Sequence, residues 1–219
     1  MTDPCDETGA RRSPVKREAI VEAALRVFLR EGYARASVDA IAADAGVSKR
    51  TIYNHFADKR DLFATIVERS SAALVADHAR IAERHLVAAE DARAALTAFG
   101  DEWLSAGGRR ADHGALVRLL ISEAAHFPEA ARVWTARGPD CSLRSLAAHL
   151  RAMADRGLLD LGVGEEETAA GHYVALVRSP VNNRAFFGAL PLPEAEVRAV
   201  VRSGVDAFLR IHGAAVPHH

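Results

Sequence analysis

Hydrophobic residues recur along the chain with the spacing of amphipathic helices, and no stretch alternates between apolar and polar residues as a strand does. The first such segment begins near Pro14 and places Ile20, Val27 and Phe28 on one face. Pro180 is expected to kink or interrupt a later helix, because proline has no N–H to donate. The later helices are expected near residues 61–86, 91–107, 112–125, 128–136, 139–156, 165–187 and 194–212. The pattern predicts an all-α fold.

Two short helical segments, joined by a tight turn, follow the first helix. Ser37 is a good N-cap for the first of them, and Gly46 stops it, most simply in a left-handed conformation. In the second segment Ile52 and Phe56 point inward, which leaves polar and basic residues on the other sides. Two short helices with a glycine turn and a polar, basic second helix form the pattern of a helix-turn-helix.

The outer sides of the second short helix carry side chains suited to DNA. Lys49 and Arg50 can donate to guanine or to phosphates, and Asn54 can pair with adenine. Helix N-termini attract phosphate through free N–H groups and the helix dipole. The side chains expected to contact DNA are Ser37, Ser48, Lys49, Arg50, Tyr53, Asn54, His55 and Lys59. The pattern alone leaves open that the segment is an ordinary solvated helical hairpin.

Composition and charge place this segment on a globular protein. The chain is 49% hydrophobic and 26% charged, with a net charge of -1. Residues 9–60 hold 11 Lys and Arg against 6 Asp and Glu, which suggests one anion-binding module on a nearly neutral body. The absence of a membrane-length apolar run, the lack of an apolar leader and the presence of only Cys5 and Cys141 predict a cytoplasmic location.

Residues 17–67 closely resemble the N-terminal domain of TetR-family transcriptional regulators. The resemblance is carried by Phe28, Gly32, Tyr33, Ser37, Ile41, Ala42, Ala45, Gly46, Val47, Ser48, Thr51, Ile52, Tyr53, His55, Phe56, Lys59, Leu62 and Phe63. It implies a recognition helix at residues 48–56, phosphate contacts from Ser37, Tyr53 and Lys59, and a further DNA contact from Thr51. It also implies double-stranded operator DNA as the partner.

Residues 118–139 are similar to the start of the ligand-binding core in an AefR-like branch of the same family. The resemblance implies a helical domain with a pocket for a small-molecule effector, and a homodimer formed through the last two long helices. The candidate pocket residues are Phe99, Trp103, His126, Phe127, Trp134, His149, Met153 and Tyr173. The candidate dimer-interface residues are Leu176, Val177, Phe186, Val197, Val201, Val205 and Phe208. For both sets, burial within the core of one chain is the alternative interpretation.

These observations predict a disordered arm at 1–13, a helix-turn-helix domain at 14–74 with its motif at about 37–56, and a helical ligand-binding and dimerisation domain at 75–219. The predicted function is that of a ligand-responsive regulator, interpreted as a repressor. A homodimer would bind a pseudo-palindromic operator and be released by a small molecule. No cofactor, metal or membrane partner is expected.

The same residues allow two other interpretations of the function. An enzyme is disfavoured because the sequence has no nucleophile elbow, phosphate loop, metal-ligand spacing or paired carboxylates in an apolar frame. A helical small-molecule-binding or interaction protein without a DNA-binding role stays open. A structure in which Lys49, Arg50 and Tyr53 do not face outward would favour it.

Overall fold

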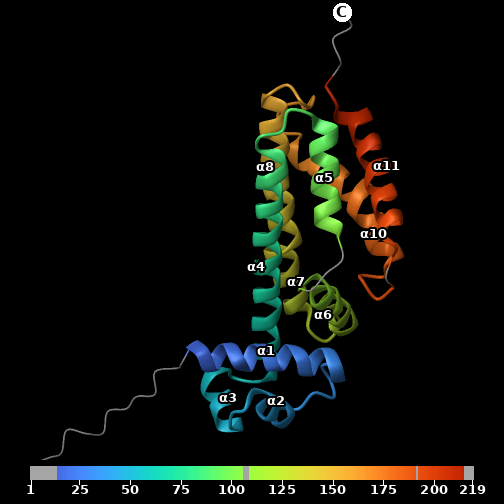
Figure 1. The fold of residues 1–219 in the computed structure, drawn as a ribbon. Coiled ribbons are helices and arrows are strands. Elements are labelled where there is room, and N and C mark those ends of the chain that lie inside the picture. Colours follow the sequence, from blue (N-terminus) through green and yellow to red (C-terminus); the bar gives the residue numbers. More distant parts are fainter. Residues whose placement is uncertain (1–13, 106–108, 191, 215–219) are drawn as a thin grey trace, which may run out of the picture. The chain divides into compact units, whose positions relative to one another are not determined.

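The computed structural model describes residues 14–105, 109–190 and 192–214, and the predicted arm at 1–13 lies outside these residues. The described residues are helical apart from their connections and a single isolated bridge between Leu159 and Gly213, which confirms the all-α prediction (Figure 1). The elements are α1 (Pro14–Glu31), α2 (Val38–Ala45), α3 (Lys49–His55), α4 (Lys59–Leu86), α5 (Ala92–Leu104), α6 (Arg109–Glu123), α7 (Pro128–Arg137), α8 (Pro139–Asp155), α9 (Glu166–Tyr173), the π-helix η1 (Val174–Arg178), α10 (Ser179–Arg184) and α11 (Glu194–His212).

Contacts divide the chain into two compact units, with the division between Arg69 and Ser70. Helix α4 contains this division, so its first part belongs to the first unit and the rest to the second. The domain boundary expected after residue 74 falls within the same helix.

The first unit is formed by α1, α2, α3 and the beginning of α4, with α1 lying across the two shorter helices (Figure 1). The predicted caps are present. The Ser37 hydroxyl accepts a hydrogen bond from the Ala40 N–H at 3.0 Å, and Gly46 has a φ of 64°. A left-handed φ is strained for residues with a side chain, so glycine suits this turn between α2 and α3.

An aromatic cluster holds the first unit together. The Phe28 ring lies 5.4 Å from that of Tyr33 and 5.6 Å from that of Phe63, so α1, its following loop and α4 meet here. Ile52 and Phe56 are also buried, as their spacing predicts. Edge-on and tilted ring pairs at these separations add to the stabilisation that burial supplies.

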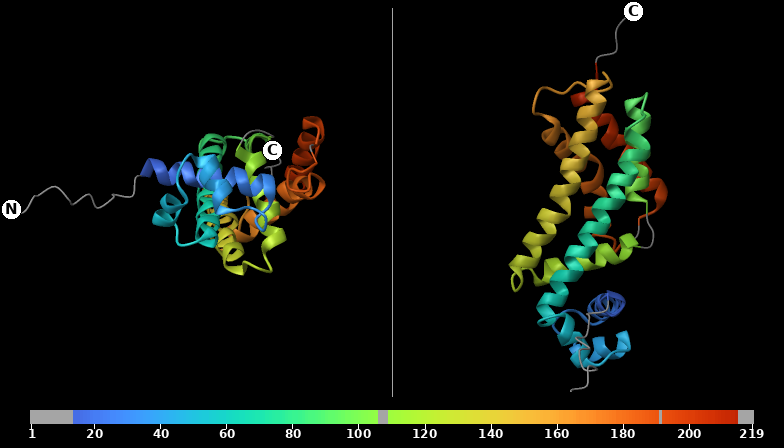
Figure 2. Two further views of the ribbon diagram at one scale, coloured as in Figure 1. Left: turned by 90° about the horizontal axis from the view of Figure 1, so that it is seen from below. Right: turned by 90° about the vertical axis from the view of Figure 1, so that its left-hand side faces the viewer.

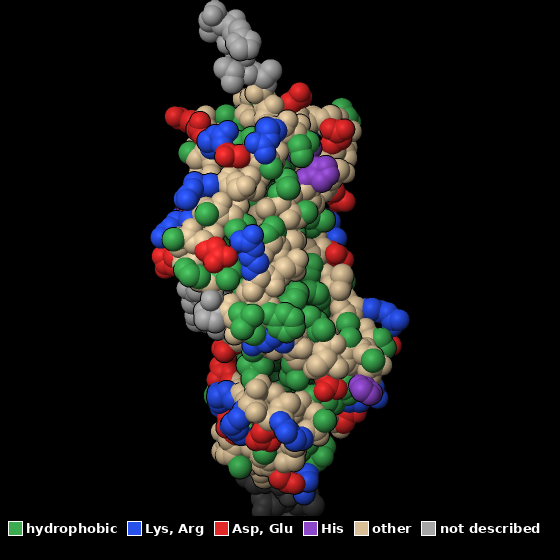
Figure 3. All heavy atoms as spheres, turned by 90° about the vertical axis from the view of Figure 1, so that its right-hand side faces the viewer, with side chains coloured by type: hydrophobic (Ala, Val, Ile, Leu, Met, Phe, Trp, Pro, Cys, Tyr) green, Lys and Arg blue, Asp and Glu red, His purple; other side chains and the backbone are tan. Residues whose placement is uncertain are grey.

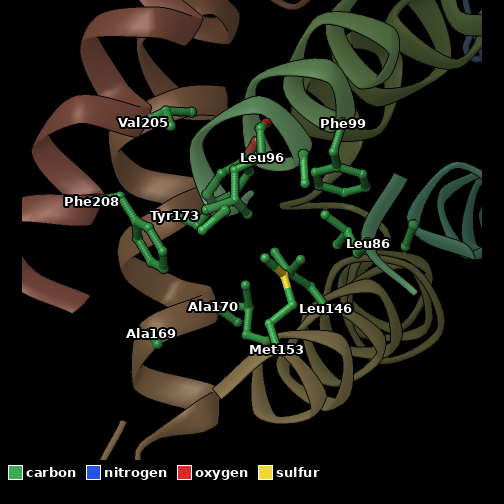
Figure 4. Packing of buried hydrophobic residues seen from close by; sticks show 14 of the residues in the cluster. Leu86, Leu96, Phe99, Leu146, Met153, Ala169, Ala170, Tyr173, Val205 and Phe208 are labelled. Atoms are coloured by element: carbon green, nitrogen blue, oxygen red, sulfur yellow. The ribbon is translucent and has the colours of Figure 1, made fainter. Parts of the chain in front are cut away.

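The second unit is a bundle whose long helices α4 and α8 run side by side (Figure 2). Its core contains Tyr173 of α9 and Phe208 of α11, whose rings lie 5.6 Å apart, with Leu96 and Phe99 of α5 beside them (Figure 4). The Tyr173 hydroxyl donates to the Leu96 carbonyl oxygen at 2.7 Å, which satisfies the one polar atom of this buried side chain. The core therefore joins α5, α9 and α11.

The helix expected at 165–187 is divided into α9, η1 and α10, and it ends at Arg184. Pro180 cannot bond to the Leu176 carbonyl four residues earlier, and the preceding turn widens so that the Ser179 N–H bonds to Val174. A Cβ on Gly204 of α11 would lie 2.5 Å from the Leu176 oxygen. The predicted interruption at Pro180 is confirmed, and it coincides with close packing of η1 against α11.

Candidate nucleic-acid interface and ligand cavity

Helix α3 presents a polar outer face because its inner face is anchored. Ile52 is 2% exposed and fixes the rotation of this seven-residue helix. Arg50 and Asn54 are exposed, and Tyr53 is 50% exposed. Lys49 is exposed and forms an ion pair with Asp39 of α2, with 3.1 Å between Nζ and Oδ2. Lys49, Arg50 and Tyr53 face outward, which argues against the alternative of a helical protein without a DNA-binding role.

Other predicted DNA-contact residues have local partners. The Ser48 hydroxyl caps α3 through the Thr51 N–H and also lies 2.8 Å from the Thr51 hydroxyl. Ser37 caps α2 in the same way, and both serines are exposed. His55 is half-buried beside Phe56. The two serines therefore act as N-caps of α2 and α3, and His55 is less accessible than the neighbouring Tyr53 and Asn54.

Lys59 has a structural role that its position in the sequence did not indicate. Its ammonium donates to the carbonyl oxygens of Tyr33 and Ala36, both at 2.9 Å, and lies 4.5 Å from the centre of the Tyr33 ring. Lys59 opens α4, and Asp58 caps this helix by accepting from the Arg60 N–H at 2.8 Å. The ammonium therefore ties the loop between α1 and α2 to the start of α4.

The second unit contains a cavity of about 390 Å³ next to a smaller one of about 210 Å³. The two share wall residues Leu74, His78, Trp103 and Arg178. The larger is also lined by Leu104, Ser105, His113, Gly114, Val117, Trp134, Val181, Asn182, Ala185, Phe187, Gly188, Leu190, Leu192 and Val197. Mostly apolar walls with a few polar groups are typical of small-molecule sites of this size.

A short polar network lies at the junction of the two cavities. The buried His78 ring bonds through Nδ1 to the Ser142 hydroxyl at 2.9 Å, and its Nε2 accepts from the Trp103 indole N–H. The Arg178 guanidinium lies over the Trp103 ring, 5.5 Å from its centre. The His113 ring bonds through Nδ1 to the Ser70 hydroxyl at 2.9 Å.

The cavity environment changes the titration of its basic groups. Burial, with the positive charge of Arg178 as a smaller cause, lowers the pKa of His113 to about 4. His113 is therefore neutral at pH 7. Burial also lowers the pKa of the Arg178 guanidinium.

Three of the predicted pocket residues, Phe99, Trp103 and Trp134, line the cavities. His126 does not line either cavity, because it follows the end of α6 and its side chain is 76% exposed beside Glu123. Four more predicted pocket residues do not line either cavity: Phe127, His149, Met153 and Tyr173. Met153 and Tyr173 fill the closed core, and the His149 ring bonds to the Ser145 carbonyl of its own helix.

Sequence reasoning missed the polar wall residues His78, His113, Arg178 and Asn182. The available signal was a basic residue inside an otherwise apolar run, "VALVRSP", at residues 174–180. A single arginine at a helix end is common on surfaces, so this signal needs the fold to be interpreted.

Four of the predicted dimer-interface residues are fully buried in the core of one chain, which favours the alternative interpretation of ordinary core packing: Val177, Val201, Val205 and Phe208. Their apolar periodicity reflects packing of η1 and α11 within the second unit. Leu176 and Val197 are half-buried, and Val197 lines the larger cavity. Phe186 is 62% exposed and stays available to a partner.

The described part of the chain contains no group of three or more His, Cys, Asp or Glu side chains placed to hold a metal ion. Within the same residues, no helix is long and apolar enough to cross a membrane.

Two family models match the chain. The model for the C-terminal domain of AefR-like transcriptional repressors matches residues 94–214, which is more than half of the chain, and the model for bacterial regulatory proteins of the tetR family matches residues 20–66. The chain belongs to the TetR family. The matched families are transcriptional regulators, which agrees with the prediction that this protein is not an enzyme.

Individual TetR-family proteins are similar over part or all of the chain. The transcriptional repressor BepR of Brucella suis is 46% identical over 54 residues, which are 25% of this chain and 26% of BepR. The alignments with this and similar curated relatives span only 25% to 48% of the length of each relative.

Solved structures of the family match over most of the chain. A TetR-family regulator of Mesorhizobium loti aligns with a TM-score of 0.83 and 28% identity over 91% of this chain and 98% of its own. The flavonoid-responsive regulator FrrA aligns with a TM-score of 0.69 and 26% identity over 93% of this chain and 100% of its own.

Proposed function

We propose that this protein is a ligand-responsive transcriptional repressor that binds operator DNA through α3. The observation that carries the proposal is the outer face of that helix. Arg50, Tyr53 and Asn54 are exposed on a helix that Ile52 anchors, and Lys49 lies beside them. A helix of this kind fits the major groove, where Arg and Lys read guanine and Asn reads adenine.

Contacts to phosphates would come from the edge of this face. Ser37 and Ser48 stand at helix N-termini, and Tyr53 carries a hydroxyl on an exposed ring. Thr51, His55 and Lys59 complete the proposed contact set. The Lys49–Asp39 ion pair is exposed, so exchanging Asp39 for a phosphate costs little. Such contacts position the protein and make binding sensitive to salt.

We propose a homodimer formed through α10, α11 and the loop between them. Hydrophobic side chains gather on the face that includes α10 and α11 (Figure 3). Phe186 and Leu190 are 62% and 60% exposed, and Ile211 near the end of α11 is also exposed. Burial of such residues against a second copy would remove apolar surface from water. Two recognition helices about 34–36 Å apart then fit a pseudo-palindromic operator.

The cavity of the second unit is the proposed effector site. An effector that binds better to the conformer that does not bind DNA lowers the affinity for DNA. Bound DNA then lowers the affinity for the effector by the same factor. Helix α4 contributes residues to both units and is the element through which we expect this coupling to pass. The similar protein FrrA is a flavonoid-responsive regulator, which supports a small-molecule effector for this chain.

The test is selection of bound fragments from the sheared genome of the source organism, followed by footprinting and sedimentation. The proposal predicts that a few fragments are enriched, with a two-fold symmetric footprint and a protein dimer in solution. Equal retention of all fragments, or none, would refute sequence-specific regulation. A monomer that binds a single half-site would refute the dimer alone.

A further inference from the structure

We propose that the cavity takes an aromatic organic anion, such as an aromatic carboxylate, whose acidic group binds Arg178. This inference rests on the proposed function, because it names the chemical class of the effector for the same cavity. Arg178 belongs to the walls of both cavities and ends the π-helix η1.

Arg178 is a cation without a neutralising partner. Among the described residues, no ion pair or hydrogen bond joins its guanidinium to another side chain, and the guanidinium lies over the Trp103 ring. Burial is the only cause that shifts its pKa, and the direction is downward, whereas a neighbouring carboxylate would act upward. Arg178 is half-buried in the cavity wall, so its charge is partly removed from water without a counter-ion, and a ligand anion would supply one.

The groups around Arg178 suit an anion's remaining lone pairs. Asn182 lies one helical turn further along and lines the same cavity, and its amide can donate. The neutral His113 has one ring N–H, and neither residue brings a negative charge. The one carboxylate in the described walls is Asp140, which lines the smaller cavity and does not contribute to the shift at Arg178.

The remaining walls suit an aromatic body. Trp103 and Trp134 contribute large rings, and Val117 and Val181 contribute apolar surface. Phe187 also lines the cavity and has a φ of 51°, a conformation that costs a bulky residue about 1–2 kcal/mol. The Arg118 guanidinium donates to the Phe187 carbonyl, which holds this wall in place. The shape of the cavity is therefore maintained by contacts outside it.

The experiment compares two fluorescent probes that differ in one charged group. 8-Anilino-1-naphthalenesulfonate is an aromatic anion, and N-phenyl-1-naphthylamine is the same ring system without the sulfonate. Both are titrated into the full-length protein without DNA, with Arg178→Met, Arg178→Lys and the control Arg210→Met. Arg210 is an exposed residue of α11, so its change removes one positive charge from the surface. Circular dichroism establishes that each variant is folded.

We expect Arg178→Met to weaken binding of the sulfonate probe by roughly 10- to 100-fold, the range for a hydrogen-bonded charge pair. Arg178→Lys should keep most of the affinity, and Arg210→Met should change it less than twofold. The neutral probe should bind all four proteins alike.

Equal loss of both probes in Arg178→Met, or no loss of the sulfonate probe, would overturn the anion assignment and leave the cavity as an effector site. Failure of both probes to bind the unaltered protein would overturn the assignment together with the effector site. DNA binding is measured separately, so neither result bears on the helix-turn-helix.

Discussion

Replacing Lys59 by methionine should destabilise the first unit. Methionine keeps the length of the apolar stem but removes the ammonium, which donates to the carbonyls of Tyr33 and Ala36 at 2.9 Å each. Hydrogen bonds to charged groups contribute about 1.5–3 kcal/mol each, and the half-buried position of Lys59 favours the lower end. Part of the loss is offset because water can reach the freed carbonyls. The expected decrease in the free energy of unfolding of this unit is about 2 kcal/mol.

Hydrogen exchange with mass spectrometry reports this change locally. Amides of α1 and α2 that open with the unit should exchange about 30-fold faster, since 1.4 kcal/mol is a factor of ten in an opening equilibrium. Lys49→Met is the matched control, because Lys49 has a single exposed ion pair worth less than about 1 kcal/mol. If the amides of Lys59→Met exchanged no faster than those of Lys49→Met, the stabilising role of the Lys59 hydrogen bonds would be refuted.

Two further changes test the packing and electrostatics of the second unit. Gly204→Ala should lower the free energy of unfolding by about 3 kcal/mol in denaturant titrations, because its Cβ would lie 2.5 Å from the backbone oxygen of Leu176. Gly171→Ala, whose Cβ would meet nothing within 4 Å beyond the nearby backbone of its own helix, should instead stabilise by about 0.5–1 kcal/mol, and equal effects would refute the close approach. The pKa of His113 is lowered from 6.5 to about 4, so the unfolded chain takes the proton first and stability falls as pH decreases from 6.5 to 4. The difference from His113→Gln should amount to at most about 3 kcal/mol across that window, and parallel pH profiles of the two proteins would contradict it.

Local signals in the sequence were sufficient for most helices and their ends. Ser37 and Gly46 act through atoms within a few residues of themselves, so their roles could be predicted from the chain alone. The same holds for the interruption at Pro180, since a missing N–H is a local property. The outer face of α3 followed from the spacing of Ile52 and Phe56.

Roles that depend on distant segments could not be predicted in this way. The stripe containing Val201, Val205 and Phe208 identifies an apolar face of α11, but the spacing does not say whether another helix or another chain covers it. The Lys59 ammonium donates to carbonyl oxygens of residues more than twenty positions earlier in the chain. Arg178 becomes a cavity wall only when η1 packs beside α5 and α11.

The most direct test of the central claim is binding of the purified protein to its own upstream intergenic DNA at two salt concentrations. Unaltered protein is compared with Arg50→Ala, Tyr53→Phe and the control Arg132→Ala, which removes an exposed arginine of α7. The account predicts tight, salt-sensitive binding that resists competitor DNA, weakened by about tenfold or more in the two α3 variants and unchanged in the control. Equal affinity of all four proteins would contradict the assignment of α3 as the DNA-binding helix.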